Sequence, residues 1–362
     1  MRKTATFSIA ILTIWSLLFV FAAAPVQAQG NSDRVVRVMT RNLDAGSDFG
    51  FVLQAVNDPN LTPPELLAAI SNTFGEMIAS NIPLRAQGIA TEIAAYQPDI
   101  IGLQEITTLR TGSFGQPADT VIVDGLQSLH TALANQGLHY KTVFVQTNAA
   151  VDLPAVDASG AFITAGFTDY DAILAHSDLP VSQMQIFDVA NDHFKAVLPF
   201  SVAGQTISFW RGWISLRVQI RGKSYKFVTT HLETFSPYIQ NMQAEELLAG
   251  PLQSNLPVIL AGDLNSDAYQ PNLETGPAIL DLEAAGFEDV WSVLHPQDAG
   301  LTWPFFAEDP PAAATPYQRI DLILTAGPGI KDKMIAETGL APFNGVWSSD
   351  HAGVFGEFVI LP

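Results

Sequence analysis

Polar residues that could hydrolyse a phosphoester stand at the ends of several apolar runs in this chain. Four of these clusters are Gln104-Glu105, Thr230-His231-Leu232-Glu233, Gly262-Asp263-Leu264-Asn265 and Ser349-Asp350-His351. Asn42 and Asp44 follow the first such run. A divalent cation held by carboxylates activates water and relieves the negative charge of a phosphoryl group. The combination indicates metal-dependent phosphoester chemistry, although any one cluster alone would be read as a turn or a helix cap.

The bulk composition limits which metals and which kinds of partner the protein can bind. The chain of 362 residues has 36 acidic and 17 basic residues, and its formal net charge is -19. An acidic surface repels nucleic acid at long range, but a bound cation can reverse the field at a site. The absence of cysteine excludes disulfides and thiolate ligands. Oxygen and imidazole ligands remain, and they favour Mg²⁺, with Mn²⁺ or Ca²⁺ as alternatives. Nothing in the sequence indicates a protein partner.

The first 28 residues have the pattern of a signal peptide. Arg2 and Lys3 precede an apolar stretch, residues 7–24, and Val26-Gln27-Ala28 is a small-residue cleavage signal. We expect cleavage after Ala28 and a secreted or periplasmic protein; an uncleaved membrane anchor is the alternative, because the stretch is long for a signal. Residues 29–362 are expected to form a single catalytic domain, since no linker or repeat divides them.

The elements that must position the polar clusters follow from hydrophobic periodicity. The expected strands are residues 35–40, 99–103, 140–145, 171–175, 184–189, 207–216, 217–220, 224–230, 257–261, 319–324 and 353–360. The expected helices are residues 85–96, 126–135, 239–248 and 279–285. Long loops are expected at residues 45–84, 107–125 and 147–168, with a short helix possible at 64–70. Strands joined partly by hairpins and partly by helices predict two packed mixed sheets with helices outside.

The topology brings the clusters to one rim of this α/β arrangement. The expected strands end just before Asn42, Glu105, His231 and Asp263, whereas Asp321, Asp350 and His351 lie at or before strand starts. Strand ends and strand starts share one rim where neighbouring strands are antiparallel. All of these polar groups can therefore meet at one edge, with loops around them.

The chain resembles the endonuclease/exonuclease/phosphatase superfamily from Arg34 to its end, as an exported bacterial-type member. The motifs, in family order, are Arg-Asn-Leu-Asp, Pro-Asp-Ile-Ile-Gly-Leu-Gln-Glu, Thr-His-Leu-Glu, Gly-Asp-Leu-Asn, Arg-Ile-Asp and Ser-Asp-His. That superfamily includes pancreatic-type deoxyribonucleases, abasic-site endonucleases, bacterial sphingomyelinases and inositol-polyphosphate 5-phosphatases. The resemblance implies a four-layered α/β sandwich with its site on one rim.

The resemblance also implies a role for each matching residue. The implied metal ligands are Glu105, Asp44 and Asp350, with Asn42 at the phosphate. The implied catalytic residues are His231, Asp263, Asn265, Asp321 and His351. In these roles Asp263 would orient or deprotonate the attacking water, and Asp321 would hold His351 and raise its pKa. Asn265 would donate to phosphoryl oxygens, and His231 would contact phosphate or protonate the leaving group.

Other residues have weaker support from the sequence. Arg211 is a candidate phosphate contact, although a place on a strand surface explains it equally well. Asp169 and Asp171 flank a strand start and are weaker candidates, and Glu233 is either a metal or substrate contact or a solvated turn residue.

The substrate stays open. We expect a metal-dependent phosphodiesterase and favour nucleic acid. A sphingomyelinase-like phospholipase C is the alternative, because the aromatic run Trp303-Pro304-Phe305-Phe306 could dip into a membrane or pack beneath its own loop. A phosphomonoesterase acting on a sugar or inositol phosphate is a further alternative.

Overall fold

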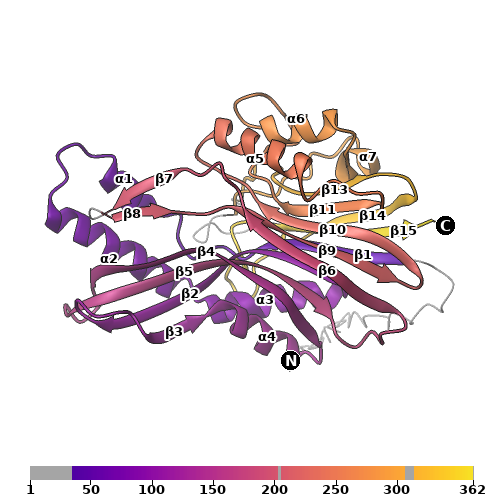
Figure 1. Cartoon of the computed structure of the whole chain (residues 1–362). Coiled ribbons are helices and arrows are strands. Elements are labelled where there is room, and N and C mark those ends of the chain that lie inside the picture. The colour runs from indigo at the N-terminus through magenta and orange to yellow at the C-terminus, as the bar shows by residue number, and fades with distance from the viewer. Residues whose placement is uncertain (1–34, 203–204, 306–313, 362) are drawn as a thin grey trace, which may run out of the picture. The chain divides into compact units, whose positions relative to one another are not determined.

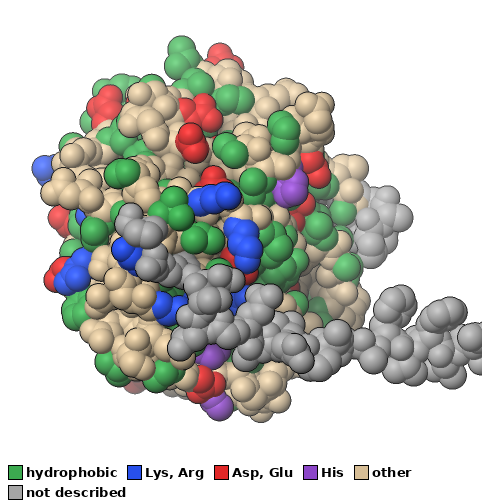
Figure 2. All heavy atoms as spheres, turned by 90° about the vertical axis from the view of Figure 1, so that its right-hand side faces the viewer, with side chains coloured by type: hydrophobic (Ala, Val, Ile, Leu, Met, Phe, Trp, Pro, Cys, Tyr) green, Lys and Arg blue, Asp and Glu red, His purple; other side chains and the backbone are tan. Residues whose placement is uncertain are grey.

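The computed structural model describes residues 35–202, 205–305 and 314–361, and all of them lie in one compact unit that spans residues 34–362. The expected signal peptide lies outside the described residues, and so does Phe306. No helix in the described part of the chain is long and apolar enough to cross a membrane. The face in Figure 2 mixes acidic, basic and hydrophobic side chains, so the acidic excess is not gathered there as one patch.

Two mixed β-sheets pack face to face (Figure 1). The first has the order β14-β15-β1-β2-β5-β4, with β3 beside β2. Its strands are β1 (Val35–Asn42), β2 (Ile100–Ser113), β3 (Thr120–Asp124), β4 (Tyr140–Val156), β5 (Phe162–His176), β14 (Ile330–Thr338) and β15 (Gly353–Ile360). The second has the order β12-β13-β11-β10-β9-β6. Its strands are β6 (Met184–His193), β9 (Gly212–Ile220), β10 (Lys223–His231), β11 (Val258–Asp263), β12 (Glu288–Asp289) and β13 (Asp321–Ala326). A separate hairpin pairs β7 (Pro199–Val202) with β8 (Gln205–Ser208).

Helices cover the outer face of each sheet and complete four layers (Figure 1). The helices are α1 (Gly50–Val56), α2 (Pro63–Ala79), α3 (Ile82–Tyr96), α4 (Gly125–Asn135), α5 (Pro237–Ala249), α6 (Pro277–Ala284) and α7 (Val290–Leu294). Apolar residues of α3 and α4 pack on the first sheet, and those of α5 and α6 pack on the second. A further apolar cluster fills the space between the sheets. The predicted four-layered α/β sandwich is therefore confirmed.

Strand register places the polar residues next to one another. β1 runs parallel to β2, with Asn42 opposite Gln104. β10 runs parallel to β11, with His231 opposite Asp263. β13 runs antiparallel to β11, so its first residue, Asp321, also lies opposite Asp263. Parallel strands end at the same edge and an antiparallel strand begins there, which is why one rim collects these side chains.

The three long loops expected from the sequence are wrong, although the short helix considered possible at residues 64–70 is present as part of α2. Residues 45–84 contain α1 and α2, residues 107–125 contain the end of β2 and all of β3, and residues 147–168 belong mainly to the β4–β5 hairpin. The start of α2 had a local signal, because the Thr62 N–H donates to the Glu65 carboxylate at 2.9 Å, as in a capping box. The hairpin had none, because its buried positions are often alanine, and packing against α2 rather than β-propensity decides its structure.

Other expected boundaries also change. The run 207–216 is not one strand: β8 ends at Ser208 and β9 begins at Gly212, so Arg211 stands between strands. Strand β14 and the short elements β12 and α7 had no counterpart in the sequence analysis. Glu105 does not follow the end of its strand, because β2 continues to Ser113. Instead, the pairing of β2 with β5 shifts register between Leu103 and Ile106, and Glu105 has a φ of 54°. Such a bulge re-aims one side chain without ending the strand.

Candidate active site

Asn42 joins the acidic groups of the two sheets. It is fully buried at the end of β1. Its side-chain amide donates to Glu105 Oε1 and to Asp263 Oδ2, each at 3.0 Å. The other oxygen of Glu105 accepts the backbone N–H of Ala45 at 2.9 Å. These donors hold two carboxylates from different sheets at one place while leaving lone pairs on both.

His351 is held as a cation by carboxylates on several sides. Its Nδ1 lies 2.7 Å from Asp321 Oδ2, so the pairing expected from the sequence is present. Its Nε2 lies 3.9 Å from Asp263 and 3.9 Å from Asp350. Burial alone would lower the pKa of His351, but Asp321, Asp350 and Asp263 outweigh burial and raise that pKa well above its usual value. His351 therefore presents positive charge beside Asp263.

The carboxylate of Asp263 is almost fully buried. Burial, together with Asp321, raises its pKa to about 7, although His351 and the hydrogen bonds from Asn265 and Asn42 oppose that shift. A carboxylate with a pKa near neutrality accepts a proton more readily than a solvent-exposed one does. Asp263 can therefore act as a base at ordinary pH.

His231 also lies beside Asp263, but its ring is neutral, whereas the ring of His351 is cationic. Arg211 Nη1 lies 2.7 Å from His231 Nδ1. A guanidinium can only donate, so Nδ1 must accept and the hydrogen of a neutral ring must sit on Nε2. Burial, then Arg211 and His351, lower the pKa of His231 well below its usual value. Its Nε2–H faces Asp263 Oδ2 at 3.4 Å and Glu105 Oε1 at 3.8 Å.

The hydrogen-bond partners of His231 and His351 bear on which residues can bind a metal. Two sets of three side chains place donor atoms within 4.8 Å of one another: Glu105, His231 and Asp263, and Asp263, Asp321 and His351. Each set includes a histidine. The Nδ1 of His231 is occupied by Arg211 and that of His351 by Asp321, and hard divalent cations prefer carboxylate oxygen to imidazole. Among the described residues, a hard cation at this rim would therefore be held by carboxylates.

The remaining expected ligands line the same cavity but have other partners. Both carboxylate oxygens of Asp44 are occupied: Oδ2 accepts from Arg85 at 2.8 Å and Oδ1 from the backbone of Gly46 at 2.6 Å. Asp350 Oδ2 accepts from the Trp303 indole at 3.2 Å. Burial, followed by Asp44 and, more weakly, Glu105, raises the pKa of Asp350, so these carboxylates repel one another. A divalent cation among them would relieve that repulsion, and the donor set fits one.

Asn265 and Glu233 line the cavity and are both held by hydrogen bonds. Asn265 has a φ of 48°, its backbone N–H donates to Asp263 Oδ1, and its side-chain amide donates to the Leu232 carbonyl at 3.0 Å. One hydrogen of that amide remains for a ligand. Glu233 is buried, and its carboxylate accepts the Phe235 N–H at 2.8 Å, so the reading of a solvated turn residue is wrong.

A buried acidic pair, Asp169 and Asp171, lies within the electrostatic influence of Arg211. Asp169 and Asp171 are both buried, and the Asn148 amide donates to Asp169 at 3.0 Å. Burial, followed by Asp171, raises the pKa of Asp169 well above its usual value, while Arg211 lowers it. Burial likewise raises the pKa of Asp171 to about 7. These two residues had only weak support in the sequence, because Arg211 lies about 40 residues further along the chain, between β8 and β9.

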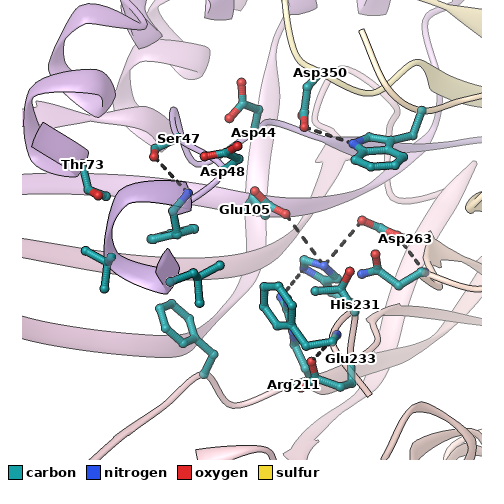
Figure 3. Close-up of a pocket in the computed structure, with 18 of the residues that line it drawn as sticks. Asp44, Ser47, Asp48, Thr73, Glu105, Arg211, His231, Glu233, Asp263 and Asp350 are labelled. Atoms are coloured by element: carbon teal, nitrogen blue, oxygen red, sulfur yellow. Dashed lines mark hydrogen bonds and ion pairs between the residues drawn. The ribbon is translucent and has the colours of Figure 1, made fainter. Parts of the chain in front are cut away.

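The rim opens into one large cavity with a volume of about 460 Å³ (Figure 3). Glu105, Asp263, His231, Arg211 and Asp350 line one part of it. Figure 3 shows Asp44, Asp48, Ser47 and Thr73 on the opposite side of Glu105 from Asp263. The cavity has the size of small-molecule and cofactor sites.

Comparison with known proteins gives one family and many similar folds. The model of the Endonuclease/Exonuclease/phosphatase family matches residues 71–351. No curated protein matches the chain significantly. A humanized TDP2 from D. rerio is 18% identical, with 90% of this chain and 99% of that chain covered and a TM-score of 0.51. D. rerio TDP2 complexed with single strand DNA product is 17% identical, with the same coverages and TM-score. A protein of the same family from Bacteroides thetaiotaomicron is 15% identical over 91% of this chain and 99% of its own, also with a TM-score of 0.51. At these identities the structures show a shared fold.

Proposed function

Because the chain belongs to the endonuclease/exonuclease/phosphatase family, it is a metal-dependent phosphoric ester hydrolase, and we propose that it cleaves phosphodiesters by attack of water at this rim. The observation that carries the proposal is the convergence of Glu105, Asp263 and His351, which come from three separate segments of the chain. A metal-binding carboxylate, a base and a fixed positive charge are what hydrolysis of an anionic ester requires.

Glu105, with Asp44 and Asp350 beside it, would hold the cation, and we propose Mg²⁺. Carboxylate oxygens are the ligands that Mg²⁺ prefers. When bound, Mg²⁺ would polarise a phosphoryl oxygen and lower the pKa of nearby water. Because the Arg85 guanidinium, 2.8 Å away, already offsets the charge of Asp44, Asp44 would bind the cation less strongly than Glu105.

The protein residues supply the proton transfer and the charge stabilisation. Asp263 takes a proton from the attacking water, whose oxygen bonds to phosphorus as the ester P–O bond breaks. The imidazolium of His351 and the Nε2–H of His231 donate to the phosphoryl oxygens, where negative charge accumulates. Asn265 contributes its remaining amide hydrogen, and Asn42 keeps Asp263 in place.

Nucleic acid is the substrate favoured by the sequence. The complex of D. rerio TDP2 with single strand DNA product supports testing it first. The phospholipase alternative loses the contribution of Phe305, because that ring is buried against Trp347, with ring centroids 5.1 Å apart, and is not available to insert into a membrane; Phe306 lies outside the described residues. Nothing in the cavity favours the phosphomonoesterase alternative.

The test is hydrolysis of bis(p-nitrophenyl) phosphate and nicking of plasmid DNA, each with Mg²⁺ and with excess EDTA. Activity should require the metal, and Asp263→Asn should lower the rate by about a hundredfold or more, because the base is lost. Asp119→Asn, which changes an exposed carboxyl outside the cavity, is the matched control. Undiminished hydrolysis in EDTA, or a normal rate for Asp263→Asn, would contradict the proposed function.

We also propose that the protein is exported and that the leader is removed after Ala28. The basic start, apolar stretch and small-residue cleavage signal support this proposal. Intact-mass measurement of protein recovered from outside the cytoplasm would test it, and an N-terminus that retains residues 1–28 would contradict cleavage.

A further inference from the structure

The cavity continues from the charged rim into an apolar compartment that the proposed reaction does not use. We define the apolar compartment by six of its lining residues: Phe49, Val52, Phe74, Leu153, Phe167 and Phe209. It belongs to the same continuous cavity as Glu105 and His231. In Figure 3 apolar side chains occupy the region between the labelled Thr73 and Arg211. A molecule that fills the whole cavity must therefore combine an anionic group with an apolar one.

The walls of the apolar compartment come from the segments that the sequence analysis had assigned to loops. Val52 lies on α1, Phe74 on α2, and Leu153 and Phe167 on the β4–β5 hairpin. The ring of Phe49 lies 5.6 Å from that of Phe167 and 5.6 Å from that of Phe209, in edge-on contacts. This aromatic packing gives the compartment a preformed wall, which reduces the entropic cost of ordering it on binding.

Several wall residues keep apolar surface available to a ligand. Phe49, Val52 and Phe209 are only half-buried, whereas Phe74 and Leu153 beneath them belong to a buried apolar cluster. Half-buried apolar groups grouped inside a concave site mark a place where an apolar ligand group gains free energy by leaving water.

The charges of the cavity argue against a long polyanion. Among the described residues, seven carboxylates line it: Asp44, Asp48, Glu105, Glu233, Asp263, Glu274 and Asp350. In the described part of the chain, Arg211 supplies the one guanidinium of the lining, and it is directed at His231. A nucleic-acid strand is held through several phosphates by lysine and arginine side chains. A substrate with a single phosphodiester charge, placed at the rim, avoids that requirement.

We propose that the substrate is an alkyl phosphodiester whose hydrocarbon arm fills the apolar compartment while its phosphorus lies at the Glu105–Asp263–His351 rim. The proposal rests on the proposed function and names its substrate class. Water adds its oxygen to phosphorus, one ester P–O bond breaks, and the leaving oxygen takes a proton. The products are a phosphomonoester and an alcohol, and no other reactant is needed.

Binding is measured first, because it does not depend on turnover. Methyl-, butyl- and octylphosphonate are titrated calorimetrically into the Mg²⁺-loaded protein below their micellar concentrations. Burying a methylene should tighten binding about fourfold, so octylphosphonate should bind at least about tenfold more tightly than butylphosphonate. Val52→Trp should fill the compartment and abolish this chain-length dependence while leaving methylphosphonate binding unchanged.

The matched control is Val181→Trp, which adds the same ring at a side chain that is 73% exposed and outside the cavity. It should bind all three phosphonates as the wild type does. If Val52→Trp fails to fold, as judged by its melting transition, Val52→Asn keeps the size of the residue and should weaken octylphosphonate binding selectively. Equal affinities for the three phosphonates in the wild type would overturn the proposal.

Turnover separates this proposal from the proposed function. Methyl and octyl p-nitrophenyl phosphate are compared with plasmid DNA, and the octyl ester should have the lowest KM in the wild type only. Chain-length-dependent binding without hydrolysis of any diester would refute the proposed function but keep the compartment. Plasmid nicking that is unchanged in Val52→Trp, with no preference for the octyl ester, would refute the alkyl substrate and favour nucleic acid.

Discussion

The substitution Asp321→Asn tests whether Asp321 keeps His351 in its cationic form beside Asp263, the proposed base. Asn keeps the size of the side chain and can still accept the Nδ1–H of His351, but it removes the negative charge that lies 2.7 Å away. Asp321 is the first of the carboxylates that raise the pKa of His351 against the effect of burial. The variant should therefore hold His351 less firmly in its cationic form.

The size of the effect follows from the contact that is lost. A hydrogen bond to a charged group contributes about 1.5–3 kcal/mol, and each pKa unit corresponds to about 1.4 kcal/mol. The alkaline limb of the rate profile should therefore move down by roughly 1–2 pH units. At the original optimum the rate should fall by about a hundredfold if the imidazolium stabilises the transition state, and part of the loss should be recovered at lower pH.

Asp321→Asn should also lower the free energy of unfolding, and the size of that loss should depend on pH. The pKa of His351 is higher in the folded protein than in the unfolded chain, so the pair stabilises the fold most below the unfolded value of about 6.5. That stabilisation is lost as the pH rises through the folded pKa. Asp321→Asn should therefore lose most stability at acidic pH and progressively less at alkaline pH, as measured by urea unfolding.

The assay is the rate of bis(p-nitrophenyl) phosphate hydrolysis between pH 5 and pH 10 at saturating Mg²⁺. Asp178→Asn is the control, because it alters an exposed Asp–His pair, that of Asp178 with His139 at 3.0 Å. Its profile should match that of the wild type. An alkaline limb that stays in place in Asp321→Asn, with a normal rate, would refute the assignment of His351 as a cation held by Asp321.

Three further outcomes are expected. Glu105→Gln should abolish the rise in melting temperature that Mg²⁺ gives the wild type, where a ligand at a hundred times its Kd contributes about 2.7 kcal/mol; an unchanged metal-induced rise would show that Glu105 is not a ligand. Arg211→Met removes a cation that lowers the pKa of His231, so that pKa should rise when the ring is titrated by NMR; an unchanged pKa of His231 would contradict the contact. Phe305→Ser should cost about 3–5 kcal/mol in urea unfolding, because the ring is buried against Trp347, and should leave vesicle co-sedimentation unchanged.

The sequence by itself determined the framework and the chemistry of the rim. β-branched apolar runs such as residues 35–40 and 257–261 form buried strands. Their residue types favour a strand, and their apolar character favours a place in the core, so both tendencies lead to the same structure. The polar residues that border such runs, Asn42, His231 and Asp263, could therefore be assigned to strand ends. The order of the motifs added the family, which the comparison confirmed.

Only the tertiary structure decided how those residues are arranged. Glu105 faces the rim because a bulge interrupts the pairing of β2 with β5, and nothing in the sequence around it signals that shift. The tautomer of His231 is set by Arg211, which is 20 residues away and lies between two strands. Contacts of this kind depend on which strands become neighbours and on where a bulge shifts their pairing, and the periodicity of a single strand encodes neither.

The apolar compartment could not be predicted from the sequence for the same reason. The segments that build it, residues 45–84 and 147–168, are rich in small and polar residues and were read as loops. Their helices and hairpin are stabilised by packing on one another, through Phe74, Leu153 and Phe167, rather than by the propensity of either segment alone. The local sequence thus supplied the candidate catalytic groups, whereas long-range packing created the space in which a substrate would be selected.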